Sequence, residues 1–213
     1  MTEPCVKEQG ALAAAQWRKT GFARAWAEGD TYRDLLSFPR QMAAVLIAAD
    51  NPEPGVIVDV GSGPGDFLAV MLDQFPQARG VWTDVSEAMF DMAQEQLAPY
   101  GDRVDFHLVD MTDLAGGGVP EDAGVITTSR AAHHLDRDGL FDFYAQAAGR
   151  LAPGGWLVNL DHIGPRDDDW DKLLRVVRKR FQPPAKAARP HHHKQSHQPI
   201  PSPSPTQPQL SPE

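Results

Sequence analysis

One short stretch constrains the fold of this chain more than any other. The sequence "VIVDVGSGPGDFLAVML" begins with three apolar residues, continues through Asp59, and carries glycines at alternate positions, Gly61, Gly63 and Gly65. A helical apolar pattern starts after the last glycine. Glycines let the backbone turn sharply and let a ligand approach it closely. The stretch predicts a strand, a tight turn and a helix whose N-terminal amides face a ligand, and an ordinary tight turn is the alternative interpretation.

Apolar strands and helices alternate through the rest of the chain as far as residue 181. Short apolar strands separated by helices indicate a parallel sheet with right-handed crossovers and helices on both faces. We therefore predict an α/β fold with a Rossmann-like, doubly wound parallel sheet and five recognisable strands. The expected strands are 55–60, 79–85, 104–110, 123–129 and 155–162, and the expected helices are 65–75, 86–99, 137–151 and 168–181.

Two N-terminal helices are expected before the sheet. The first covers 11–29, and Gly21 is expected to weaken it in the middle and divide it. The second follows a cap at Asp30 or Thr31, and we expect Pro39 to interrupt it. Together these helices form a predicted cap over residues 1–50.

The composition of the chain changes near residue 181. Residues 182–213 hold nine of the nineteen prolines and almost no large apolar side chains. Such a segment cannot bury enough apolar surface to offset the entropy of ordering it, so we expect a disordered, partly polyproline-like tail. The predicted organisation is a helical cap at 1–50, a ligand-binding core at 51–181 and the tail at 182–213.

Composition and charge limit the partners and the compartment. The net charge is −9, and the tail carries +2 of it, so the remainder carries about −11 and has no basic block suited to nucleic acid. Cys5 is the only cysteine, which excludes a disulfide within the chain and fits a reducing cytosol. The N-terminus lacks an apolar signal core, and no apolar run approaches the ~20 residues needed to cross a bilayer. We expect a soluble cytoplasmic protein with no nucleic-acid or membrane partner.

Three carboxylates are expected at successive strand ends. Asp59 ends the first strand, Asp84 the second and Asp110 the third. A carboxylate at the second strand end can accept hydrogen bonds from both ribose hydroxyls, and Asp110 can accept one from an adenine amine while Met111 packs on the ring. Each acid alone could be a helix cap or a solvated charge. Ligands of open α/β sheets bind at the carboxyl ends of the strands, so three acids there favour an adenosine ligand.

Four segments carry a resemblance to a known family. "VIVDVGSGPG", "GVWTDVS", "HLVDMTD" and "LAPGGWLVNLDH" resemble, in order and spacing, the class I S-adenosylmethionine-dependent methyltransferases, over about residues 50–163. The match is most similar to small-molecule methyltransferases of the ubiquinone-biosynthesis-like kind. The resemblance implies S-adenosylmethionine as cofactor and an SN2 transfer of its methyl group to a small-molecule acceptor.

The resemblance also implies which residues bind the cofactor. The acid of the second strand is expected at the ribose and that of the third at the adenine. S-adenosylmethionine carries a sulfonium cation and no pyrophosphate, so an acid-lined pocket favours it over a nicotinamide dinucleotide. Arg40, or a residue of the N-terminal helices, could pair with the cofactor's carboxylate, and a surface charge is the alternative for Arg40. The expected cofactor residues are Asp59, Gly61, Ser62, Gly63, Gly65, Asp84, Val85, Asp110, Met111, Ser129 and Arg130.

The segment after the fourth strand is expected to carry the chemistry. In the family that "VITTSRAAHHLDRDGLF" resembles, this segment lies beside the transferring methyl group, so His133 and His134 are candidate catalytic bases. The alternative is that His134 caps a helix and His133 packs on the sheet. Adjacent histidines without a third spaced ligand do not indicate a metal site. We expect aromatic residues of the N-terminal helices to fold over the cofactor and help to form the acceptor pocket, with packing on the sheet as the alternative: Trp17, Phe22, Trp26 and Tyr32.

The chain departs from the family pattern after residue 181. Family members add a sixth and a seventh strand, whereas here the proline-rich tail begins at that point. The fifth strand, "GWLVNLDH", would then be an exposed apolar edge, and a truncated or frameshifted reading frame is one hypothesis for its origin. Two functional classes stay open: an active methyltransferase that tolerates the loss or covers the edge as a homodimer, and a non-catalytic remnant or binding module that keeps the cofactor half.

Overall fold

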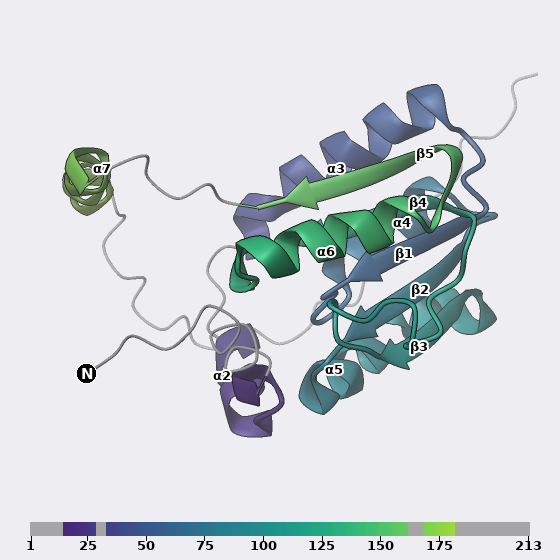
Figure 1. Ribbon diagram of the computed structural model, residues 1–213, viewed down its shortest axis with the longest axis horizontal. Helices are drawn as coiled ribbons and strands as arrows, with labels where there is room; N and C mark the ends of the chain where they lie inside the picture. Colours follow the sequence, from purple (N-terminus) through teal and green to yellow (C-terminus); the bar gives the residue numbers. More distant parts are fainter. Residues whose placement is uncertain (1–14, 29–32, 162–167, 182–213) are drawn as a thin grey trace, which may run out of the picture. The chain divides into compact units, whose positions relative to one another are not determined.

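The computed structural model describes residues 15–28, 33–161 and 168–181 (Figure 1). The chain divides into two compact units, Met1–Ile163 and Gly164–Glu213. In the second unit the described part is helix α7, Asp168–Phe181. Every other element below belongs to the first unit. The predicted caps at Asp30 and Thr31 and the predicted disordered tail lie outside the described residues.

A parallel sheet forms the centre of the first unit. Its five strands are hydrogen-bonded in the order β3-β2-β1-β4-β5, and every neighbouring pair is parallel. This order confirms the predicted α/β fold with a doubly wound sheet. The order reverses at β1, which lies between β2 and β4, and ligands of such sheets bind at that reversal. The strands are β1 Val56–Val60, β2 Arg79–Asp84, β3 Val104–Leu108, β4 Ala123–Ser129 and β5 Leu151–Leu160.

Helices cover both faces of the sheet (Figure 1). Side chains of β1 alternate between two apolar clusters: Ile57 joins the cluster formed with α3, α4 and α5, whereas Val58 and Val60 join the one formed with α6. Phe67 and Phe143 are fully buried in these two clusters, one from each face. The helices are α2 Thr20–Glu28, α3 Arg33–Asp50, α4 Asp66–Gln74, α5 Glu87–Leu97 and α6 Arg137–Ala148, with 3-10 helices η1 Ala98–Arg103 and η2 Ala132–His134.

Helix α3 runs without a break through Pro39, so the predicted interruption there is wrong. A proline within a helix removes one backbone donor, and the acceptor it leaves belongs to the residue four positions earlier. That residue is Leu35, which is 68% exposed, so water can reach this part of the helix.

The first N-terminal segment is divided, as predicted, but not at Gly21. Helical residues 15–17 end in a turn at Arg18, and α2 starts at Thr20 with Gly21 inside it. The backbone N–H of Lys19 donates to the carbonyl of Gln16, which closes the first turn before the second helix begins.

Strand β5 begins four residues earlier than predicted, because the "LAPGG" turn pairs with β4 through a register shift between Ala123 and Val125. Gly155 allows this close approach, since a Cβ there would lie 3.0 Å from the Ala123 carbonyl oxygen. In the described part of the chain β5 is an edge strand, as the sequence indicated.

Candidate cofactor and acceptor site

A cavity of about 510 Å³ opens at the carboxyl ends of the strands. It is bounded by the turn between β1 and α4, by residues after β2, β3 and β4, and by the segment around α2. Ten of the eleven predicted cofactor residues line it. Among the described residues, the predicted site residues that do not line it are Gly65 and His133. The structure thus brings almost the whole predicted cofactor set into one space.

The glycine turn combines backbone freedom with close packing. Gly61, Gly63 and Gly65 all have left-handed backbones, with φ of +61°, +57° and +90°. A Cβ on Gly61 would lie 2.5 Å from the Ala131 Cβ, and one on Gly65 would lie 2.8 Å from Leu97. Gly63 differs, because the nearest atom to its added Cβ would be 4.0 Å away. Gly61 and Gly65 therefore close the turn against its neighbours, while Gly63 keeps backbone open to the cavity.

Asp59 lies beneath this turn and is only 1% exposed. One carboxylate oxygen accepts a hydrogen bond from the Thr127 hydroxyl at 2.7 Å, and the other accepts one from the Ser62 hydroxyl at 2.5 Å. Burial raises the pKa of Asp59 to about 6, although these hydrogen bonds and nearby Arg40 act in the opposite direction. Asp59 thus ties the turn to β4 as well as lining the cavity.

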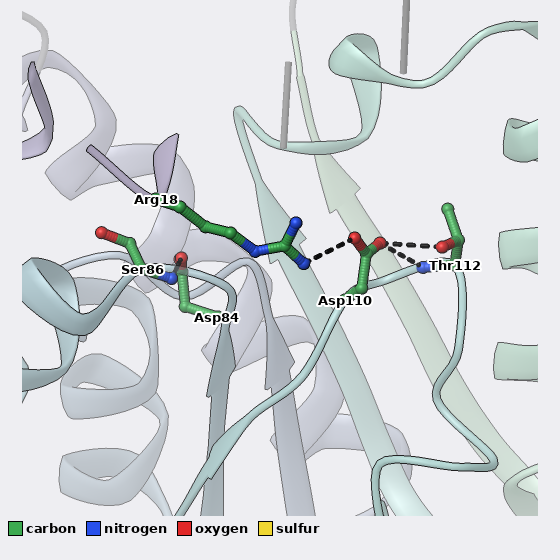
Figure 2. A network of polar contacts seen from close by, with 5 residues as sticks. All are labelled: Arg18, Asp84, Ser86, Asp110 and Thr112. Atoms are coloured by element: carbon green, nitrogen blue, oxygen red, sulfur yellow. Dashed lines mark hydrogen bonds and ion pairs between the residues drawn. The ribbon is translucent and has the colours of Figure 1, made fainter. Parts of the chain in front are cut away.

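Backbone N–H groups hold both carboxylate oxygens of Asp84. Its Oδ2 accepts a hydrogen bond from the Gly63 N–H at 2.9 Å. Its Oδ1 accepts one at 3.0 Å from the N–H of Ser86, which lies beside it in Figure 2. Burial raises the pKa of Asp84 to about 6 as well. Each carboxylate oxygen can accept more than one hydrogen bond, so Asp84 keeps capacity for a ligand's hydroxyl groups.

Asp110 lies two residues beyond the end of β3 and forms an ion pair with an arginine of the N-terminal segment. Its Oδ1 accepts hydrogen bonds from the Thr112 backbone N–H at 3.0 Å and the Thr112 hydroxyl at 2.8 Å. The Arg18 guanidinium lies 3.6 Å from its Oδ2 (Figure 2). Sequence reasoning missed Arg18 as a site residue, because nothing local marks it as reaching a strand end 92 positions later.

Aromatic side chains also line the cavity, as expected for Trp17 and Trp26, and this part of the wall is called the aromatic end below. Their rings meet edge to face at 5.2 Å, and Trp17 also meets the His134 ring edge to face at 5.5 Å. The Arg130 guanidinium lies 4.7 Å from the centre of the Trp26 ring. Phe22 packs edge-on against Trp17 instead of lining the cavity, in the part of the chain that is described. Tyr32 lies outside the described residues.

The two adjacent histidines have different surroundings. His134 lines the cavity, whereas the His133 ring nitrogen Nδ1 lies 2.8 Å from Asp161 Oδ1. The His133 backbone N–H donates to the other Asp161 oxygen at 3.1 Å, and the two histidine rings lie 4.1 Å apart. Asp161 therefore anchors the turn that presents His134. Sequence reasoning missed it, although its position just after β5 continues the series of acids at strand ends.

Arg40 is buried, so the alternative of a surface charge is wrong. It is 9% exposed, lines the cavity and lies 3.7 Å from a carboxylate oxygen of Asp66. Within 15–28, 33–161 and 168–181, no three histidine, cysteine or acidic side chains are grouped as a metal site would require. None of the described helices is long and apolar enough to cross a membrane.

The fold and the cavity are those of a ligand-binding, doubly wound α/β domain. Residues 57–155 match the family model described as "Methyltransferase domain". The fold is similar to that of Burkholderia thailandensis 1,6-didemethyltoxoflavin-N1-methyltransferase, with a TM-score of 0.59 at 20% identity over 78% of this chain and 68% of that one. Residues 57–155 therefore resemble a methyltransferase domain, and S-adenosylmethionine is the cofactor that this family implies.

Two curated relatives are similar in sequence. Trans-aconitate 2-methyltransferase of Variovorax paradoxus is 32% identical over 149 residues, which are 68% of this chain and 52% of the relative. The 3-amino-4-hydroxybenzoate 4-O-methyltransferase of Streptomyces cremeus is 31% identical over 109 residues, 51% of this chain and 29% of the relative. The chain thus spans between about a third and a half of the length of these two proteins.

The residues present fit the family's cofactor. The cavity volume lies within the range of about 300–1,000 Å³ that small-molecule sites occupy. Open backbone at Gly63 lies beside the Asp84 carboxylate, which suits an adenosine ribose held close to the turn. Acids outnumber bases along the cavity wall in the described residues, which suits a sulfonium cation better than a pyrophosphate.

Proposed function

We propose that this chain binds S-adenosylmethionine in the cavity and methylates a small-molecule acceptor held beside Trp17 and Trp26. One observation carries the proposal: a single cavity is lined by the glycine turn, by the carboxylates of Asp59, Asp84 and Asp110, and by an aromatic end with a histidine. An ordinary structural turn has no need of three strand-end acids and an open glycine around one space.

Each end of the cavity has a proposed task. At the cofactor end Asp84 accepts the ribose hydroxyls, Asp110 and Met111 receive the adenine, and the Gly61 to Gly63 backbone borders the amino acid portion. Buried Arg40 supplies positive charge near that portion. The remaining predicted contacts, Ser62, Val85, Ser129 and Arg130, line the same cavity.

Methyl transfer requires a correctly positioned acceptor molecule and one group that takes up its proton. The bound cofactor supplies a methyl group that is already activated by its positive sulfur. Holding the acceptor in line supplies most of the acceleration, because the reactants no longer lose translational freedom at the barrier. His134 lies at the aromatic end and takes the proton that an oxygen or nitrogen acceptor releases. Asp161 and His133 hold the turn that carries it.

The relatives support a small acceptor. Trans-aconitate, 3-amino-4-hydroxybenzoate and 1,6-didemethyltoxoflavin appear in the names of three of them, and all are small molecules. The acidic cavity also disfavours a polyanionic acceptor such as nucleic acid. The ubiquinone-biosynthesis-like specificity, a cytoplasmic location and a homodimer formed through the edge of β5 stay predictions.

Cofactor binding tests the proposal directly. Isothermal titration calorimetry of the full chain with S-adenosylmethionine, S-adenosylhomocysteine and NAD should show heat with the first two compounds only. Asp84→Asn should weaken binding by at least about tenfold, because a ribose hydroxyl loses a charged acceptor. Asp102→Asn, which removes an exposed acid of η1, is the control and should bind normally. Heat with NAD and none with S-adenosylhomocysteine would overturn the proposal.

A binding module without turnover is the second candidate. It is favoured by the location of the cofactor residues, which all come from β1 to β4 and their turns, before the edge strand β5. The two candidates differ in one measurement. With a panel of small acceptors, an enzyme releases S-adenosylhomocysteine in many turnovers, whereas a module binds the cofactor and releases none.

A further inference from the structure

Negatively charged side chains outnumber positively charged ones among the described residues around the cavity. Among the described residues, seven aspartates and three arginines line it. Two of these arginines contact acids at the cofactor end, since Arg18 lies 3.6 Å from Asp110 and Arg40 lies 3.7 Å from Asp66. The third, Arg130, belongs to the aromatic end. Negative side chains therefore outnumber positive ones in the described part of the cavity wall.

Three of the seven aspartates belong to one helix and its cap. Asp136, Asp138 and Asp142 line the cavity from the N-cap and the first half of α6. Asp136 caps the helix by accepting the Gly139 N–H at 2.6 Å. Asp138 and Asp142 are four residues apart on the helix, so their side chains share one face, and both are exposed at the cavity mouth. Like charges that lie close together reinforce each other's electrostatic potential. They therefore raise the local concentration of ions of opposite sign.

In the aromatic wall, one of the two indoles already has an arginine beside it. The Arg130 guanidinium lies 4.7 Å from the centre of the Trp26 ring, within the range of a cation–π interaction. Arg130 reaches this place with a left-handed backbone, φ +57°, which is uncommon for a residue other than glycine. The Trp17 indole lies edge-on to the Trp26 indole, with 5.2 Å between the two ring centres. The two indoles supply apolar surface to the cavity wall.

We infer that, if the proposed function holds, the acceptor end selects a small aromatic or apolar amine that is positively charged in water, and disfavours polycarboxylates. The carboxylates of α6 attract the ammonium group, and the indoles of Trp17 and Trp26 hold its apolar body. A polycarboxylate in the same cavity meets more aspartates than arginines. The Coulomb attraction is screened by salt over roughly 8–10 Å, so the selectivity depends on ionic strength.

Three matched probes test this inference without turnover. The full chain, saturated with S-adenosylhomocysteine, is titrated with 2-phenylethylamine, 2-phenylethanol and 3-phenylpropionate, which share a ring but differ in charge. Propane-1,2,3-tricarboxylate serves as the polyanion. Tryptophan fluorescence and calorimetry report binding. The amine should bind at least about tenfold tighter than the carboxylate, with the alcohol between them, and 0.5 M salt should narrow the difference.

Two variants identify the source of the preference. The double change Asp138→Asn and Asp142→Asn should bring the amine and carboxylate affinities within about threefold of each other, since both acids are exposed and their loss leaves the core intact. Trp26→Leu should weaken all the ring-bearing probes together. Asp102→Asn on η1 is the matched control and should preserve the preference.

The outcomes separate this inference from the proposed function. Failure to bind S-adenosylhomocysteine overturns the proposed function. Normal binding of that compound together with equal affinities, tighter binding of an anion, or no binding of any probe overturns only the amine preference. Retention of the full preference in the double variant overturns the role of the α6 carboxylates.

Discussion

The two ends of the cavity are built differently. At the cofactor end, Asp59 and Asp84 are held by hydrogen bonds of 2.5–3.0 Å to the glycine turn, to β4 and to the start of α5. At the acceptor end, side chains from the segment around α2 and from the turn after β4 meet through ring contacts of 5.2 and 5.5 Å. The first end is fixed by the sheet, whereas the second depends on packing between segments distant in sequence. Mutations should therefore separate cofactor binding from acceptor binding.

Gly61→Val should have the largest effect and should break the cofactor end. The added Cβ would lie 2.5 Å from Ala131, and the left-handed backbone at φ +61° strains any side chain. We expect a loss of about 3 kcal/mol in the free energy of unfolding and no measurable cofactor binding. Urea denaturation and calorimetry with S-adenosylhomocysteine provide the measurements.

Gly55→Val is the matched control for that change. Gly55 has φ +67°, but nothing lies within 4 Å of its added Cβ, so this variant carries the backbone strain without the clash. It should lose about 1–2 kcal/mol and keep cofactor binding. Equal behaviour of the two variants would show that contact with Ala131 is unimportant.

His134→Gln should reduce methyl transfer while leaving cofactor binding almost unchanged. Cofactor affinity should stay within about twofold, while methyl transfer to the best acceptor of a panel falls by about 10²–10⁴-fold, the usual contribution of a general base. His133→Gln should cost less, because this residue acts by positioning the turn. Release of S-adenosylhomocysteine measures the rate, and undiminished transfer by the His134 variant would remove its role as the base.

The pH dependence of cofactor binding should report Asp84. Its raised pKa of about 6 means that the carboxylate loses charge as the pH falls through 6. Affinity for S-adenosylhomocysteine should fall about tenfold between pH 7.5 and pH 5, and Asp84→Asn should flatten this dependence. A wild-type profile retained by the variant would assign the transition to another group.

Protein stability should respond to pH in the opposite sense. Asp59 and Asp84 both have pKa values raised from 3.8 to about 6 in the fold, so the folded state binds protons more tightly than the unfolded chain. Their contribution to stability is complete below about pH 4 and is lost as the pH rises through 6. Asp59→Asn should reduce this loss in urea titrations of the ligand-free protein.

Arg18→Gln should have the smallest effect. The Arg18 side chain is 57% exposed, and exposed ion pairs contribute about 0–1 kcal/mol. We expect cofactor affinity to change by no more than about threefold, since Asp110 keeps its hydrogen bonds to Thr112. Arg24→Gln, which removes a similar pair with Asp91 on α5, is the control. A large loss of cofactor binding in the Arg18 variant alone would show that the N-terminal segment belongs to the cofactor end.

The gathering of the predicted cofactor residues around one cavity was predictable because the signals in the sequence are local. The glycines and Asp59 lie within one strand and turn, Asp84 ends the apolar strand β2, and Asp110 lies two residues beyond β3. Strand positions and the doubly wound order follow from the same alternation. The early start of β5 was not predictable, because the "LAPGG" turn pairs through a register shift that depends on its neighbour.

The acceptor end could be predicted only in outline. Bulky aromatic residues marked Trp17 and Trp26, but nothing in the local pattern showed that Arg18 would reach Asp110, or that Asp161 would hold His133. Such contacts depend on how segments pack in three dimensions. Helix α3 is a second example, since helix propensity alone predicts a break at Pro39. The helix continues there because Leu35, whose carbonyl loses its partner, is exposed to water.

The close approach of Gly61 to Ala131 has a consequence for how the two ligands bind. Gly61 belongs to the turn at the cofactor end, and Ala131 precedes the turn that carries both histidines. With no room for a methyl group between them, neither turn can shift far without displacing the other. Occupancy at one end should therefore alter affinity at the other, and by reciprocity the acceptor should tighten or loosen the cofactor by the same factor.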